Sequence, residues 1–262
     1  MNFSERFLKV SNALITLVVT LAFLLAGTYA AFALWDNNTV YAAAENVQAE
    51  MLQLKPEIDL QQGGGASFED LLAINQDVRA WITLDHTSID YPILQGATNL
   101  TYINTNVYGE FALAGSIFMD TRSDGSFKDH YSLLYGHDMI EGRMFGDLSL
   151  YKDEKFFQEY STGKLILPDR TYDLTVYAVL VLQSSDDAIF DPETHEDGLS
   201  DFLKYVDKNA LHQRSNLTES LRKTANSQLQ ILSLTTCSAE FTDARTIVLA
   251  IMEPSILKGA DE

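Results

Sequence analysis

The longest run of apolar residues lies near the N-terminus. From Ala13 to Leu34 the sequence carries no charged residue (ALITLVVTLAFLLAGTYAAFAL). A helix of this length is long enough to cross a hydrocarbon core of about 30 Å. Arg6 and Lys9 precede the run, whereas acidic residues follow it. The positive-inside tendency then predicts residues 1–12 in the cytoplasm and the remainder of the chain outside the cell.

We therefore predict a transmembrane anchor over residues 13–35. A cleaved signal peptide is the alternative, because Ala31-Phe32-Ala33 has the small-x-small form of a cleavage site. The apolar run exceeds the core of about 7–15 residues usual in signal peptides, which favours the anchor. Under both interpretations the rest of the chain is exported. A buried core helix is a third interpretation, which the lack of any polar face in the run disfavours.

The segment after the apolar run has the composition of a stalk. Residues 36–66 include a stretch of helical composition that ends at three consecutive glycines, Gly63 to Gly65. Consecutive glycines form a flexible hinge, so we place the domain boundary there. This division leaves residues 67–253 for a folded domain and residues 254–262 for a C-terminal tail.

Residues 67–253 alternate short apolar runs with turn residues, a pattern typical of a mostly-β domain with flanking helices. Seven or eight strands of this kind predict a closed or nearly closed barrel. Ser67 is predicted to cap the first helix of the domain, and Leu199 to Ala210 have the spacing of an amphipathic helix. The predicted strands are 81–84, 89–94, 115–119, 131–135, 164–167, 172–182, 229–234 and 246–252, and further helices are predicted at 144–151 and 154–160.

Charge and cysteine content exclude several classes of function. The 262 residues carry a formal net charge of −19, which argues against binding to double-stranded nucleic acid because such binding needs a basic face. Cys237 is the single cysteine, so the chain forms no internal disulfide and no cysteine-rich zinc or iron–sulfur site.

Cys237 stands where an apolar strand gives way to polar residues. A lone cysteine is most often a small buried hydrophobic residue, and that interpretation stays open here. However, an exported chain usually avoids an unpaired thiol, which is prone to oxidation. The strand-end position and the export signal together make Cys237 a candidate nucleophile.

A cysteine nucleophile needs a base, and His137 is the best candidate because it also directly follows an apolar strand. An imidazole can take the proton of the thiol and later return it to a leaving amine. The other histidines have weaker positions in turns or beside helices. They are His86, His130, His195 and His212.

Arg245 begins the strand that follows Cys237, so antiparallel pairing of the two strands would bring it close to the cysteine. A guanidinium fixed at this position can donate hydrogen bonds to the oxyanion of a tetrahedral intermediate. The alternative is a surface arginine paired with Asp243 or Glu240.

The sequence Leu234-Thr235-Thr236-Cys237, with Arg245 eight residues later, resembles the TLxTC…R signature of the sortases. His137, Cys237 and Arg245 occur in the chain order of that family and have its flanking residues. The resemblance extends over residues 67–253. The upstream segments resemble class B sortases in particular. These segments are Trp81-Ile82, 89–96 (IDYPILQG), 115–120 (GSIFMD), 135–139 (YGHDM), Met144-Phe145, Phe156-Phe157 and the helix at 199–210.

The resemblance implies a sortase-type closed β-barrel in which Cys237, His137 and Arg245 take the three catalytic positions. Asn99, Thr235 and Tyr135 would lie close to the substrate. Asn99 could instead cap a turn, and Thr235 could serve only to pack the sheet.

By the same resemblance the protein is a membrane-anchored cysteine transpeptidase with an extracellular catalytic domain. It would cleave the C-terminal sorting motif of exported proteins through a thioacyl-enzyme and pass the acyl group to an amine. That amine would belong to cell-wall peptide or to a lysine of a pilin subunit. The resemblance implies no metal and no organic cofactor.

Two rival functions belong to other classes. A tethered binding module would keep the barrel without the chemistry, and slow alkylation of Cys237 would reveal it. A plain cysteine endopeptidase would form the same acyl-enzyme, so the sequence separates it poorly. An added amine separates the two enzymes, because it diverts the product from hydrolysis to ligation.

Overall fold

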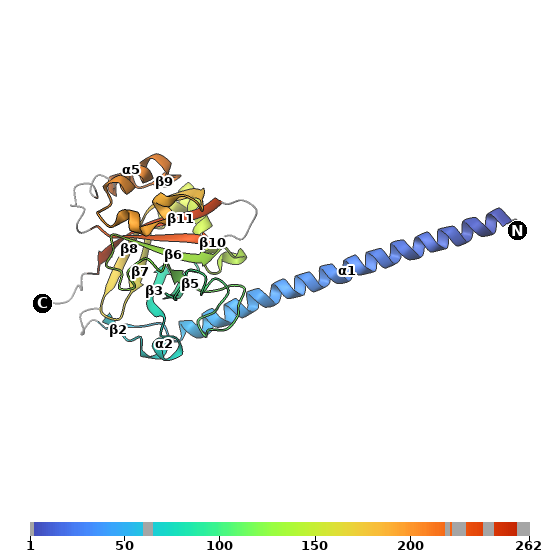
Figure 1. The fold of residues 1–262 in the computed structure, drawn as a ribbon, viewed down its shortest axis with the longest axis horizontal. Helices are drawn as coiled ribbons and strands as arrows, with labels where there is room; N and C mark the ends of the chain where they lie inside the picture. The colour runs from blue at the N-terminus through green and yellow to red at the C-terminus, as the bar shows by residue number, and fades with distance from the viewer. Residues whose placement is uncertain (1–2, 60–64, 218–220, 222–228, 238–243, 256–262) are drawn as a thin grey trace. The chain divides into compact units, whose positions relative to one another are not determined.

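The computed structural model describes residues 3–59, 65–217, 221, 229–237 and 244–255. Its Cα positions form two compact units, Met1–Ala43 and Ala44–Glu262. Helix α1 (Phe3–Leu52) begins in the first unit and supplies the first residues of the second (Figure 1).

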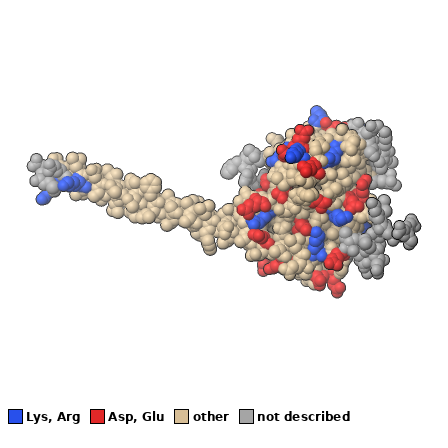
Figure 2. Space-filling view, turned by 180° about the vertical axis from the view of Figure 1, so that it is seen from behind, with Lys and Arg blue, Asp and Glu red and all other residues tan. Residues whose placement is uncertain are grey.

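Within the described residues α1 is the one helix long and apolar enough to cross a membrane. Its most apolar window of 18 residues has a mean hydropathy of 2.2, and none of that window is buried within the structure. Figure 2 shows basic side chains gathered at the N-terminal end of this helix. The third interpretation of the run, a buried core helix, is therefore wrong, whereas an anchor and a signal sequence both satisfy the length and composition of α1.

The second unit is built on a closed β-barrel, as the sequence predicted. Its eight strands follow one another around the ring in the order β11-β10-β6-β5-β4-β3-β7-β8, and β8 pairs again with β11 to close the ring. A short further strand, β9 (His212–Gln213), pairs with β8. The strands are β3 (Val78–Leu84), β4 (Asp90–Leu94), β5 (Ile117–Met119), β6 (Tyr131–His137), β7 (Thr162–Ile166), β8 (Thr171–Gln183), β10 (Ile231–Cys237) and β11 (Ala244–Pro254).

The helices predicted from the sequence are present in the described residues, together with short helices that the sequence did not indicate. The N-cap residue of helix α2 (Glu69–Ile74) is Phe68, and no side chain caps the helix, so the prediction of Ser67 as the cap is wrong. The other helices are η2 (Ile140–Gly142), η3 (Gly146–Lys152), α3 (Glu154–Glu159), α4 (Asp187–Phe190), η4 (Pro192–His195) and α5 (Ser200–Asn209).

Two apolar clusters hold α5, α2 and the end of α1 against the barrel. Phe202, Leu203 and Val206 of α5 are buried together with strand residues such as Tyr131 and Tyr177. The second cluster, which we call the Trp81 cluster, joins α2 and the end of α1 to the barrel. Figure 1 shows α5 and α2 on different sides of the barrel. Buried members of the Trp81 cluster are Met51, Phe68, Leu71, Val78, Trp81, Leu94, Tyr102, Val107, Phe118 and Ile166.

The end of α1 belongs to the folded unit. Met51 is 2% exposed in the Trp81 cluster, and Val47 and Leu54 pack against the same cluster. Their spacing of three and four residues places them on one face of the helix. The compact unit thus begins at Ala44, upstream of the boundary predicted near Ser67.

Polar contacts also fasten the end of α1 to loops of the folded unit. Glu45 forms an ion pair with Arg143 (2.7 Å). The amide of Gln48 donates to the carbonyl of Ser88 (3.0 Å). Beyond these residues the predicted glycine hinge lies largely outside the described chain, since residues 60–64 are not described.

Candidate active site

The ends of three neighbouring strands bring the predicted catalytic residues together. Strands β10 and β6 run parallel, and their register pairs the Cα atoms of Cys237 and His137. Each of these residues is the last of its strand. Parallel strands with both faces covered require almost continuous apolar runs, which explains the sequences ILSLTT and YSLL before them. Of Cys237 the structure describes the backbone position alone.

His137 is half-buried, and its ring is held from one side. Its Nε2 atom lies 2.7 Å from the carbonyl oxygen of Ile103. Because a carbonyl only accepts, Nε2 carries the hydrogen, and in the neutral imidazole Nδ1 is then the acceptor. The backbone carbonyl of His137 also accepts from the amide of Phe145 (2.9 Å), which fixes the turn after the strand. This arrangement suits a histidine that takes up a proton through Nδ1.

The residue before His137 has to be small. A Cβ atom on Gly136 would approach the Cδ1 atom of Ile117 to 2.5 Å and the ring of Phe145 to 2.7 Å. The glycine therefore allows the side chains of Ile117 and Phe145 to pack directly against the strand that ends at His137.

Arg245 lies near the start of β11, at the same end of the barrel as Cys237. Strand β11 runs antiparallel to β10, and the amide of Thr246 donates to the hydroxyl of Thr236 (3.1 Å). The guanidinium Nη1 of Arg245 donates to the backbone carbonyl of Thr236, at 3.3 Å. The side chain thus lies against the residue immediately before Cys237. Its alternative partners, Asp243 and Glu240, lie outside the described residues.

Asn99 and Tyr135, two of the predicted substrate-binding residues, meet at one carboxylate. The Nδ2 atom of Asn99 donates to Oδ2 of Asp120 (2.9 Å), and the hydroxyl of Tyr135 donates to the same oxygen (3.0 Å). Burial and the neighbouring Asp120 raise the pKa of Tyr135 far above its ordinary value, so its hydroxyl stays protonated. Both side chains are half-buried.

Thr235, the third residue predicted to lie close to the substrate, is packed within the sheet. The residue is fully buried, and its hydroxyl donates to the backbone carbonyl of Leu134 on the neighbouring strand (2.9 Å). Its hydroxyl hydrogen is therefore used within the sheet.

The other four histidines contact residues outside the predicted site. His195 is buried between Tyr131 and Phe202, and burial lowers its pKa. The remaining three have neighbours of their own. The ring of His86 stacks on Tyr160 (4.2 Å), His130 Nδ1 contacts the carbonyl of Leu229 (3.0 Å), and His212 Nε2 contacts the carbonyl of Lys152 (2.9 Å).

Sequence reasoning gave no role to two groups that contact the predicted site residues. One is the carbonyl of Ile103, which no sequence pattern could single out. The other is the side chain of Asp120, which directly follows a strand and precedes Arg122 by two residues. An acidic residue that immediately follows a buried strand was the available signal.

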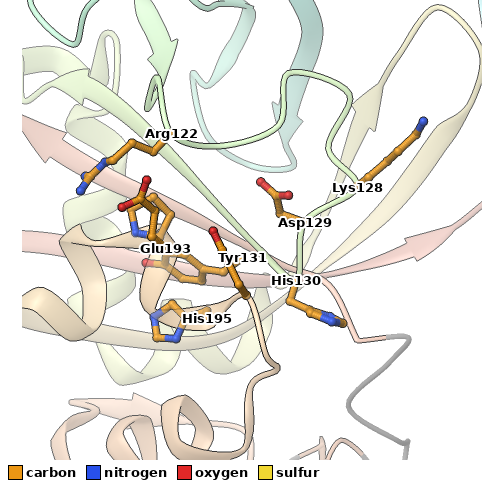
Figure 3. A pocket seen from close by; sticks show the side chains of 9 residues that line it. Arg122, Lys128, Asp129, His130, Tyr131, Glu193 and His195 are labelled. Atoms are coloured by element: carbon orange, nitrogen blue, oxygen red, sulfur yellow. The ribbon is translucent and has the colours of Figure 1, made fainter.

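A cavity of about 360 Å³ opens near the start of β6, six residues before His137. Figure 3 shows Arg122, Tyr131 and His195 among its side chains. It mixes acidic and basic groups and includes none of the predicted site residues. Among the described residues, no group of three or more His, Cys, Asp or Glu side chains could hold a metal ion.

In a comparison with protein families, the family model of the sortase domain matches residues 82–253 of this chain. Sortase B of Listeria monocytogenes is 30% identical over 226 residues, covering 86% of this chain and 89% of that protein. Among solved structures, a Streptococcus pyogenes class B sortase involved in pilus biogenesis is 35% identical with a TM-score of 0.63, covering 71% of this chain and 98% of that one. The Staphylococcus aureus sortase B–substrate complex is 25% identical with a TM-score of 0.64, covering 82% and 94%.

Proposed function

The chain belongs to the sortase family, in its class B, and is a cysteine transpeptidase; we propose that Cys237, His137 and Arg245 carry out its reaction at the strand ends. The observation that carries this proposal is the register that pairs the Cα atoms of Cys237 and His137. The contact of the Arg245 guanidinium with the carbonyl of Thr236 supports the third assignment.

In the proposed first half-reaction, the thiolate of Cys237 attacks the carbonyl carbon of a threonine in the sorting motif of an exported protein. His137 has taken the thiol proton and returns it to the amine that leaves as the peptide bond breaks. Arg245, together with a backbone N–H, donates to the oxyanion of the tetrahedral intermediate. The product is a thioester between the threonine and Cys237.

In the second half-reaction, an amine attacks the thioester carbonyl and gives its proton to His137, while the thiolate of Cys237 leaves. The new amide joins the exported protein to its acceptor. We propose an amine of cell-wall peptide or a pilin lysine as that acceptor. The relative from Streptococcus pyogenes is involved in pilus biogenesis, which supports testing both.

Sortases are cell-surface enzymes, and we propose that residues 13–35 anchor this one with the catalytic domain outside the cell. The apolar composition of α1 and the basic residues Arg6 and Lys9 before it support this orientation. The exported substrates would then meet the enzyme at the outer face of the membrane.

The proposal can be tested with the full chain in detergent, a panel of threonine-containing sorting peptides and two acceptors, a cell-wall peptide amine and a pilin lysine peptide. We expect mass spectrometry to show cleavage and a ligated product with one acceptor. The Cys237→Ala variant should do neither and should melt at the wild-type temperature. Hydrolysis that no amine diverts would indicate an endopeptidase, and activity in Cys237→Ala would remove Cys237 as the nucleophile.

A further inference from the structure

Asp120 directly follows β5 and is fully buried, and its two carboxylate oxygens are surrounded by donors. Oδ1 accepts from the backbone amide and the Nε atom of Arg122, both at 2.9 Å. Oδ2 accepts from Nη2 of the same arginine, also at 2.9 Å. The arginine thus grips the carboxylate through two side-chain nitrogens, which fixes its plane.

Oδ2 also accepts the hydrogen bonds from Asn99 and Tyr135 described above. The Asn99 amide is held at its other end as well, because its Oδ1 accepts from the backbone amide of Thr121 (2.8 Å). Its two ends therefore cannot exchange. Because the hydroxyl of Tyr135 donates its hydrogen to Asp120, its phenolic oxygen can only accept a hydrogen bond from a further group.

Two more contacts of Arg122 extend the network. Nη1 forms an ion pair with Asp191 (3.1 Å), and Nη2 donates to the carbonyl of Phe190 (2.7 Å). Phe190 and Asp191 lie in the insertion that carries α4, η4 and α5 between β8 and β10. One carboxylate and one guanidinium thus connect the segment around Asn99, strand β6 and the insertion.

The carboxylate remains charged despite its burial. Burial alone would raise the pKa of Asp120, but the hydrogen bonds from Arg122 and Tyr135 outweigh it and hold the pKa below its ordinary value. An ionised carboxylate accepts at both oxygens, which the five donors around it require. An asparagine at this position would turn an NH₂ group toward some of these donors.

We propose that Asp120, fixed by Arg122, is a positioning residue of the transpeptidase: it holds the side chains of Asn99 and Tyr135 in the orientation that receives the sorting peptide. This inference rests on the proposed function, in which these two side chains contact the substrate. Asp120 itself is buried and acts only through them.

The decisive variant is Asp120→Asn in the full chain, assayed for peptide cleavage and amine ligation. We expect KM for the peptide to rise about tenfold or more, because hydrogen bonds to a charged group are lost on both substrate-facing side chains. kcat should change less than about threefold, and the rate of Cys237 alkylation should not change. The matched control is Asp186→Asn, which removes the charge of the carboxylate that accepts from the Tyr205 hydroxyl near α4 and should leave KM unchanged.

A double-mutant cycle with Tyr135→Phe adds a readout that a merely structural role would not move. The rise in KM caused by Tyr135→Phe should be smaller in the Asp120→Asn background, since the two residues then act as one unit. Additive effects, or an Asp120→Asn variant with wild-type KM and a lowered melting temperature, would overturn the proposal.

If Asp120→Asn does not fold, Arg122→Lys takes its place, because the arginine side chain is 35% exposed and lysine keeps the charge without the fork. KM should again rise while kcat holds, and an unchanged KM would overturn the proposal. A wild-type enzyme that fails to ligate any amine would instead refute the proposed function, so the two failures are distinguishable.

Discussion

The strand ends around Cys237 and the end of α1 around Met51 both contact segments distant in sequence, but the two sets of contacts differ in kind. At the strand ends, polar side chains contact backbone carbonyls, as His137 does at Ile103 and Arg245 at Thr236. At the end of α1, an apolar side chain is buried in the Trp81 cluster. Substitutions in the first region should change the reaction rate, and substitutions in the second should change the free energy of unfolding.

The largest expected effect among single conservative substitutions is that of Arg245→Lys. An ammonium on a flexible stem cannot reproduce the planar fork of the guanidinium. If Arg245 stabilises the oxyanion, kcat should fall on the order of 10²–10³-fold, as when an oxyanion donor is removed. Steady-state kinetics on a sorting peptide measure this effect, with the melting temperature expected to stay at the wild-type value.

The control for this substitution is Arg170→Lys. Arg170 is also partly buried and pairs with Asp169, but it lies in the turn between β7 and β8, at the other end of β11 from Arg245. Its replacement should leave kcat/KM unchanged. A kcat/KM of Arg245→Lys within about threefold of wild type, less than about 1 kcal/mol of barrier, would remove Arg245 from the catalytic set.

The next effect concerns the other region. Met51→Ala should lower the free energy of unfolding by about 2–3 kcal/mol, at the low end for a buried methionine because the end of a helix can relax into the cavity. Denaturant unfolding measures this loss, and the kcat of the folded enzyme should remain within about threefold of wild type. The exposed Leu52→Ala, one residue further on, provides the matched control, with a change of less than about 0.5 kcal/mol.

The packing of α1 against the barrel also predicts where the shortest stable domain begins. A chain that begins at Ala44 keeps Val47, Met51 and Leu54, whereas a chain that begins at Ser67 lacks all three. We expect the longer chain to unfold at a higher denaturant concentration. Equal midpoints would mean that the contacts of α1 do not contribute to the stability of the barrel.

Sequence alone predicted the barrel because each strand is a short apolar run between turns. The catalytic roles of Cys237 and His137 follow only from the resemblance to sortases, and they stay a proposal that the register of β6 and β10 supports. The sequence did not predict the packing of Met51, since the same spacing of apolar residues also fits a free stalk helix, and only the partner surface decides between them. The Asp120 network was missed for a related reason. A single acidic residue after a strand acquires its meaning only when Asn99, Arg122 and Tyr135 converge on it.

The smallest effect tests whether the two regions are independent. The ion pair between Glu45 of α1 and Arg143 links the end of the helix to the turn that follows His137. Glu45 is 64% exposed, so solvent screens the pair, and Glu45→Gln should cost less than about 1 kcal/mol in stability. Arg143 also pairs with Glu141 (2.9 Å) and would stay anchored within the turn. We therefore expect kcat and KM of Glu45→Gln to equal those of wild type, with Glu57→Gln, another exposed acidic residue, as the control. A fall in kcat beyond about threefold, without a change in melting temperature, would instead mean that α1 affects the position of His137. The two regions would then not be independent, because a contact of α1 would change the reaction rate.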